Sequence, residues 1–129
     1  MRWVLRSKIH KATVTGADVS YVGSIAIDQN LIEKAGFWVG EKVLVVSSSS
    51  GARLETYVIA SPRGSGVITM NGAAAHLIKA GEEIIIMGFE LSDKPLKPIS
   101  ILLDKSNHFA KFLSPKEEHL SAEEVIQSF

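Results

Sequence analysis

The chain has 129 residues, 14 basic and 14 acidic side chains, no cysteine and 46% apolar residues. This length and apolar content predict a single domain over residues 1–129 with a packed core. The missing cysteine excludes disulfides, thiolate nucleophiles and cysteine-ligated metal sites. A net charge of zero argues against binding of nucleic acid over the whole surface.

Charged side chains near the start of the chain interrupt any apolar leader, at Arg2, Arg6, Lys8 and Lys11. We therefore expect no signal peptide. The longest apolar stretch, at 84–89, is far shorter than the roughly 18 residues that a membrane-spanning helix needs. The sequence predicts a cytoplasmic protein with no membrane partner.

Short β-branched stretches separated by ten glycines predict a β-rich fold. The expected strands, in chain order, cover residues 8–15, 21–28, 42–47, 52–59, 67–70, 82–89 and 99–103. A short helix is expected over 31–35, with Asn30 as its N-terminal cap and Gly36 after its last turn. Many short strands in a small chain favour a small β-barrel with short helices, because closure removes the sheet edges.

The end of the chain has a different composition. Ser114, Pro115 and Glu117 form a helix-start pattern, and Ser121 with Glu124 repeats the capping pattern. Four glutamates and one lysine lie beyond residue 114. We expect a solvent-exposed, acidic, helical C-terminal tail.

The four histidines, at 10, 76, 108 and 119, lack the helical spacing of a zinc-protease site. We predict that His108 and His119 lie at the surface and that the protein uses no metal. A more specific pattern is Asn71 followed by Gly72, Ala73, Ala74 and Ala75. These small residues leave backbone N–H groups open to an anion, although an ordinary strand-to-helix turn uses the same residues.

Arg53 and Tyr57 lie four residues apart in one expected strand and so project from the same face. Arginine pairs with carboxylates, and tyrosine is a proton donor at neutral pH. A solvated strand face with Glu55 beside a cation explains the pattern equally well. Thr56 belongs to the opposite face.

Gly23 and Ser24 interrupt an apolar strand pattern. In a strained site, a serine after glycine can attack the preceding carbonyl carbon and form an ester, and elimination then leaves a pyruvoyl group. Glycine tolerates unusual backbone angles. The dipeptide alone says little, since Gly64 and Ser65 repeat it and glycine–serine usually forms a turn.

The surrounding blocks are more specific in combination. They are KIHKATVT at 8–15, AD at 17–18, YVGSIAID at 21–28, GARLETY at 51–57, RGSG at 63–66 and NGAAAH at 71–76. Over about residues 1–90 they resemble the bacterial aspartate 1-decarboxylase family. Gly16 stands where the family usually has histidine, Ser50 with Gly51 replaces a common Asn-Gly, and the resemblance is looser beyond about residue 90.

The resemblance implies a double-psi β-barrel and a homotetramer with active sites between subunits. It implies self-cleavage between Gly23 and Ser24, into a β chain of residues 1–23 and an α chain of residues 24–129. The pyruvoyl group from Ser24 would form a Schiff base with L-aspartate and serve as the electron sink for decarboxylation to β-alanine, on the route to pantothenate. No pyridoxal phosphate or metal is then needed. Family members differ in whether a maturation factor assists cleavage.

The family match also assigns roles by position. Lys8 and Arg53 would bind the substrate carboxylates, and Tyr57 would protonate the product carbanion. Thr56 would contact substrate and assist processing, with His10 and Tyr21 close to the processing site. The remaining substrate-binding positions are Asn71, Gly72, Ala73 and Ala74.

Two other functions compete with this one. A non-catalytic β-barrel would bind an anionic small ligand at 71–75 without any cleavage. A nucleic-acid-binding barrel would use the basic start of the chain, but its zero net charge and nine aromatic residues make it the weakest hypothesis.

Overall fold

The computed structural model describes residues 1–118, which form nine strands, two α-helices and one 3₁₀ helix, η1. The strands are β1 (Arg2–Thr13), β2 (Gly16–Asp18), β3 (Ser24–Asp28), β4 (Lys42–Ser47), β5 (Arg53–Ser61), β6 (Ile68–Asn71), β7 (Glu83–Ser92), β8 (Ile99–Leu103) and β9 (Phe109–Phe112). The helices are α1 (Gln29–Ala35), η1 (Gly72–His76) and α2 (Pro115–Glu118).

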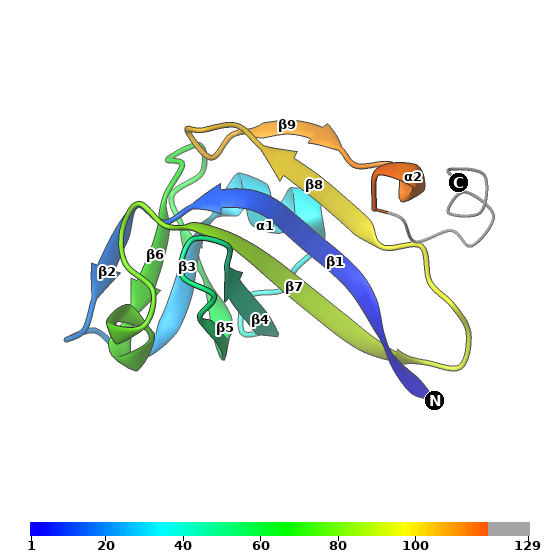
Figure 1. Ribbon diagram of the computed structural model, residues 1–129, viewed down its shortest axis with the longest axis horizontal. Coiled ribbons are helices and arrows are strands. Elements are labelled where there is room, and N and C mark those ends of the chain that lie inside the picture. Colours follow the sequence, from blue (N-terminus) through cyan, green and yellow to red (C-terminus); the bar gives the residue numbers. More distant parts are fainter. Residues whose placement is uncertain (119–129) are drawn as a thin grey trace.

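All nine strands belong to one curled sheet in the order β2-β6-β3-β5-β4-β7-β1-β8-β9 (Figure 1). The long strands β1 and β7 pair antiparallel, and β8 joins the other side of β1 in parallel. The curled, mainly β architecture confirms the fold class predicted from the sequence. Its double-psi arrangement stays a prediction.

The core forms because the central strands alternate between apolar residues that face inward and residues that face outward. In β4, Val43 and Val45 are buried, and in β7 Ile84 and Ile86 are buried. Strand β3 is buried along its whole length, as expected for a strand covered on both faces. Helix α1 packs against β3 and β8 through Leu31, Ile32 and Ala35.

Several element boundaries differ from the sequence predictions. Residues 21–23 do not continue a strand, because β3 begins only at Ser24. The N-terminal cap of α1 is Asp28 rather than Asn30, since the Asp28 carboxylate accepts the Asn30 backbone N–H at 2.8 Å. Gly36 ends α1 in a left-handed conformation, which confirms its predicted role.

The short strands β2 and β9 were not expected from the sequence. The predicted helix start at Ser114 is confirmed by α2, whereas the second capping pattern at Ser121 lies outside the described residues. His108 is exposed, as predicted, and His119 lies outside the described part of the chain. Among residues 1–118, no helix is long and apolar enough to cross a membrane.

Candidate active site

Ser24 is the first residue of β3 and is 1% exposed. Its neighbour across the sheet is Asn71, the last residue of β6 and 5% exposed. The Asn71 Nδ2 donates a hydrogen bond to Ser24 Oγ at 3.0 Å, while Ser24 Oγ is 3.4 Å from the Val22 carbonyl oxygen, to which it can donate. The serine hydroxyl is therefore buried and held on two sides.

The segment immediately before Ser24 has the opposite character. Residues 19–23 form an exposed connection between β2 and β3, and the side chains of Tyr21 and Val22 are 56% and 74% exposed. The peptide bond between Gly23 and Ser24 thus joins an exposed loop to a buried strand. Gly23 is not among the glycines with a positive φ, so it does not use the left-handed region that favours glycine.

The residues after Asn71 turn directly into η1. Gly72 is buried with a φ of +70°, Ala73 is exposed and Ala74 is half-buried. Gly72 lies against the loop before Ser24, since a Cβ placed on it would be 2.7 Å from the Gly23 Cα. The structure therefore gathers Gly23, Ser24, Asn71 and Gly72 in one place.

Strand β5 adds Thr56 and Tyr57 at a corner of the sheet. Residues 53–57 of β5 pair with β4, and residues 58–61 pair with β3, beginning with Val58 beside Ile25. Val58 pairs with Ile25, and Tyr57 and Ser24 are the residues immediately before them on the two parallel strands. The backbones of Tyr57 and Ser24 therefore lie on adjacent strands, which are about 4.8 Å apart. Thr56 is half-buried beside the inward Val43, whereas Tyr57 faces outward and is 39% exposed.

Arg53 and Lys8 lie farther from Ser24 within this chain. Arg53 is exposed at the start of β5, four residues before Tyr57. Lys8 is on β1, where its buried neighbours Ser7 and Ile9 face inward and Lys8 faces the other side. Strands β5, β4 and β7 separate β1 from β3 in the sheet. His10 lies on β1 two residues after Lys8 and is therefore equally separated from β3.

Behind the site, a buried carboxylate fixes the far end of β3. Asp28 is 1% exposed and accepts backbone N–H groups from Asn30, Gly64 and Gly66 at 2.8 to 2.9 Å. Burial alone would raise the pKa of Asp28, but these three donors outweigh it and hold the pKa below its ordinary value. Asp28 thereby joins β3 to the segment that contains Gly64 and Gly66.

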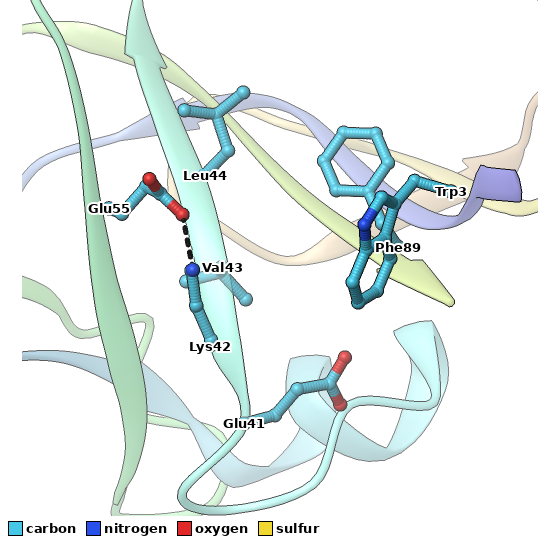
Figure 2. A pocket seen from close by; sticks show the side chains of 7 residues that line it. All are labelled: Trp3, Glu41, Lys42, Val43, Leu44, Glu55 and Phe89. Atoms are coloured by element: carbon cyan, nitrogen blue, oxygen red, sulfur yellow. Dashed lines mark ion pairs between the residues drawn. The ribbon is translucent and has the colours of Figure 1, made fainter. Parts of the chain in front are cut away.

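A separate pocket of about 630 Å³ lies on the outer side of β4, β5, β7 and β1. Figure 2 shows Trp3 and Phe89 on one side of it, the ion pair between Lys42 and Glu55 on the other, and Glu41 at its edge. Its lining contains none of the site residues predicted from the sequence. Within residues 1–118, no group of three or more histidine or acidic side chains is arranged to hold a metal ion.

Comparison with known proteins identifies the family. A model of the family described as aspartate decarboxylase matches residues 1–110, which extends the resemblance beyond residue 90. The chain belongs to the aspartate decarboxylase family. It is 51% identical to the aspartate 1-decarboxylase of Caldicellulosiruptor saccharolyticus over 90% of this chain and 93% of that protein. The enzyme of the same name from Neisseria meningitidis is 44% identical, over 92% of this chain and 96% of that protein.

Two residues near the site were not singled out by the sequence reasoning. Asp28 follows an apolar strand and directly precedes a helix, which is a recognisable N-cap signal, but Asn30 two residues later carries the same signal. Asp18 accepts from the Ser20 backbone N–H and hydroxyl at 3.0 and 2.7 Å, and so shapes the start of the loop before Gly23. The sequence Asp18-Val19-Ser20 is compatible with such a turn, yet nothing local distinguishes it from an ordinary one.

Proposed function

We propose that this chain catalyses the decarboxylation of L-aspartate to β-alanine and CO₂, using a pyruvoyl group made from its own Ser24. The observation that carries the proposal is the buried Ser24 hydroxyl, held by Asn71 at the junction between an exposed loop and a buried strand. Membership of the aspartate decarboxylase family supports the substrate and the reaction. The alternative of a non-catalytic anion-binding barrel is not favoured.

Self-cleavage would begin when Ser24 Oγ attacks the Gly23 carbonyl carbon. The carbon–nitrogen bond breaks, the nitrogen of Ser24 gains a proton, and an ester joins Gly23 to Ser24 Oγ. Loss of the Ser24 Cα proton then expels the Gly23 carboxylate and leaves dehydroalanine at the new terminus. Water hydrolyses its imine tautomer, which releases ammonia and leaves the pyruvoyl carbonyl.

The residues around Ser24 fit this chemistry. Asn71 donates to Ser24 Oγ, which orients the oxygen lone pairs and leaves the hydroxyl proton on the side of the Val22 carbonyl oxygen. Thr56 lies on the half-buried side of β5 at the corner beside Ser24, where we propose that it assists cleavage and contacts substrate. His10 and Tyr21 stay proposed processing residues, on β1 and in the loop before Ser24 respectively.

The pyruvoyl carbonyl would supply the electron sink that loss of CO₂ requires. Tyr57, on the outward side of the same corner, would give a proton to the carbon that loses the carboxylate. The Asn71 side chain and the backbone of Gly72, Ala73 and Ala74 would orient the bound amino acid beside Ser24.

Lys8 and Arg53 would bind the substrate carboxylates from a neighbouring subunit. On the outer face, Lys8 pairs with Met87, Met87 with Leu44, and Leu44 with Glu55. This row places β1 three strand spacings from β5, or about 14 Å, and β3 is one strand farther. Lys8 is thus four strands from Ser24 along the sheet of one copy, which supports the proposal that a second copy supplies it.

The outer face also has the apolar surface that a subunit contact needs. Trp3 pairs with Leu91 and Leu5 with Phe89, beside the pocket of Figure 2, and Trp3, Leu91 and Phe89 are 70%, 48% and 39% exposed. Such an exposed apolar patch is typical of an interface. We propose a homotetramer with one domain per subunit, in which each subunit is cut into chains 1–23 and 24–129. We further propose that it works in the cytoplasm and that a maturation factor is a candidate partner.

Intact mass spectrometry of the purified protein tests self-cleavage. We expect fragments corresponding to residues 1–23 and 24–129, with a carbonyl in place of the amine at the start of the larger one. Ser24→Ala should stay in one piece and release no CO₂ from L-aspartate. A wild-type chain that stays intact after long warm incubation, or a decarboxylating Ser24→Ala variant, would refute the mechanism.

Subunit mixing tests the shared site. Ser24→Ala and Lys8→Ala are each expected to be inactive or nearly so. If Lys8 acts across an interface, co-expressed mixed oligomers regain on the order of a quarter of wild-type activity, because each half of a site is drawn at random. Mixed oligomers no more active than the two parents would place Lys8 and Ser24 of one chain in the same site.

A further inference from the structure

The loop at 19–23 starts and ends beside the same residue. Asp18, at the end of β2, pairs with Asn71 on one side of β6, and Ser24, at the start of β3, pairs with Asn71 on the other. The loop must therefore cross over the end of β6, where Gly72 follows Asn71. In Figure 1, β2 and β3 flank β6 at the same end of the molecule.

Gly72 is the point at which the loop touches what lies beneath it. A Cβ on Gly72 would lie 2.7 Å from Gly23 Cα, 2.9 Å from Gly23 N and 3.1 Å from the Tyr21 carbonyl oxygen. All three are backbone atoms, which cannot rotate away as a side chain can. A Cβ on Gly23, in contrast, would meet no atom within 4 Å. The close packing at the cleavage site thus depends on Gly72 and not on Gly23.

Asp18 holds the other end of the loop. Its Oδ1 accepts from Ser20 N at 3.0 Å and from Ser20 Oγ at 2.7 Å. The Tyr21 N–H also points to the Asp18 carbonyl oxygen at 3.4 Å, which completes a turn. Residues 19–23 are all exposed, and at the far end of the loop the Val22 carbonyl oxygen accepts from Ser24 Oγ at 3.4 Å.

We propose that Gly72 and Asp18 are positioning residues of the self-cleavage reaction. Asp18 sets the direction in which the loop leaves β2, and Gly72 lets it lie close enough to β6 to hold the Gly23 carbonyl carbon next to Ser24 Oγ. This inference rests on the proposed self-cleavage and gives Gly72 a role before any substrate is bound. Neither residue exchanges a proton or bond in the reaction.

Gly72→Ala is the direct test. Ordinary contact with a Cβ begins at 3.4 Å, so the methyl group would push Gly23 away by about 0.7 Å. A misplacement of about 1 Å in a reacting group can cost on the order of 100-fold in rate, and we expect cleavage to slow by about that factor. The exposed loop, rather than the buried strand β6, should give way, so that the variant still folds.

Gly81→Ala is the matched control. Gly81 also has a left-handed φ, of +92°, but a Cβ there meets no atom within 4 Å. Both variants carry the backbone strain of alanine at positive φ, and only Gly72→Ala carries the collision. Cell-free synthesis followed by intact mass over time measures cleavage from the moment each chain is made. Thermal unfolding and size-exclusion chromatography confirm that each variant is folded.

A second pair of variants keeps the test independent of how well Gly72→Ala folds. Asp18→Asn retains a side-chain oxygen that can accept from Ser20, whereas Asp18→Ala does not. We expect Asp18→Ala to slow cleavage about 5- to 10-fold, as the loss of a side-chain hydrogen bond allows, and Asp18→Asn to restore a rate near that of wild type. If Gly72→Ala does not fold, this pair decides the proposal.

The outcomes separate the two proposals. A wild-type chain that never cleaves refutes the proposed function itself. Suppose that the wild type cleaves. If folded Gly72→Ala then cleaves as fast as Gly81→Ala, the positioning role of Gly72 is wrong. If Asp18→Ala cleaves as fast as Asp18→Asn, the positioning role of Asp18 is wrong. Treatment with hydroxylamine, which splits esters, gives a further readout. We expect the uncut Gly72→Ala chain to resist hydroxylamine. If an ester accumulates instead, the slow step comes after the attack by Ser24 and the proposal is overturned.

Discussion

Replacing Asp28 by asparagine should destabilise the fold because it places two hydrogen-bond donors opposite each other. The carboxylate accepts three backbone N–H groups, with Asn30 and Gly64 on Oδ1 and Gly66 on Oδ2 at 2.9 Å. In Asp28→Asn the oxygen can keep the first two, but the amide nitrogen then faces the buried Gly66 N–H. Two donors at this distance leave both unpaired.

The cost follows from burial. An unpaired buried donor costs about 1–3 kcal/mol, and hydrogen bonds to a charged acceptor are roughly twice as strong as neutral ones. We therefore expect Asp28→Asn to lose about 2–3 kcal/mol at neutral pH. For a chain of this size that corresponds to a fall in Tm on the order of 10 °C.

Thermal unfolding by circular dichroism, in a Ser24→Ala background that keeps the chain intact, measures this loss. The matched control is Asp104→Asn, because Asp104 is exposed and uses Oδ1 alone to accept from Ser106 and His108. Asparagine can make both of those bonds. If Asp28→Asn loses no more stability than Asp104→Asn, the three-donor account of Asp28 is wrong.

The same site predicts a pH dependence. The pKa of Asp28 in the folded state is below its ordinary value of 3.8, so the folded state favours the ionised form. This stabilisation is complete above about pH 4 and is lost as the pH falls through the folded pKa. Asparagine does not titrate there. The difference in Tm between Ser24→Ala and the double variant Ser24→Ala/Asp28→Asn should therefore narrow below pH 4. A difference that stays constant would contradict the lowered pKa of Asp28.

Two other predictions concern the site itself. Asn71→Ala removes the 3.0 Å donor to Ser24 Oγ. Because one hydrogen bond contributes about 1 kcal/mol, we expect cleavage, followed by intact mass, to slow about 5-fold. An unchanged rate would show that this bond does not orient the hydroxyl. Tyr57→Phe keeps the ring but loses the proton donor, so the chain should still cleave while decarboxylation, measured as β-alanine formed, falls by about 100- to 10,000-fold; near-normal turnover would exclude Tyr57 as the acid.

Much of the fold follows from local sequence, because its elements are bounded by residues with strong local preferences. The predicted limits of β4 and β8 match the structure, and Gly36 ends α1 where expected. The misses are of another kind. Strand β2 has three residues and exists because it pairs with β6, which is distant in sequence, and β9 depends on the turn at 104–108 that folds it back onto β8. Neither has a periodic pattern of its own.

The site divides in the same way. The side-by-side placement of Ser24 and Asn71 could not be read from spacing, since 47 positions separate them and only the antiparallel register of β3 and β6 joins them. Glycine shows the limit most clearly. The sequence drew attention to Gly23 because it precedes the serine, whereas the close backbone contacts belong to Gly72, whose requirement appears only once the loop lies over β6.

Alternation in β5 places Thr56 on the face opposite to Arg53 and Tyr57, although the family resemblance assigns all three residues to one site. Thr56 and Tyr57 do face opposite sides, as period two demands. They lie, however, where β5 leaves β4 as its partner and takes up β3, and β3 begins at Ser24. No part of β3 borders the segment of β5 before this point. Ser24 is thus at the end of a strand, and we propose that this position lets side chains from both faces of β5 serve one reacting group. Arg53 lies four residues back on β5, where it is exposed on the outer face.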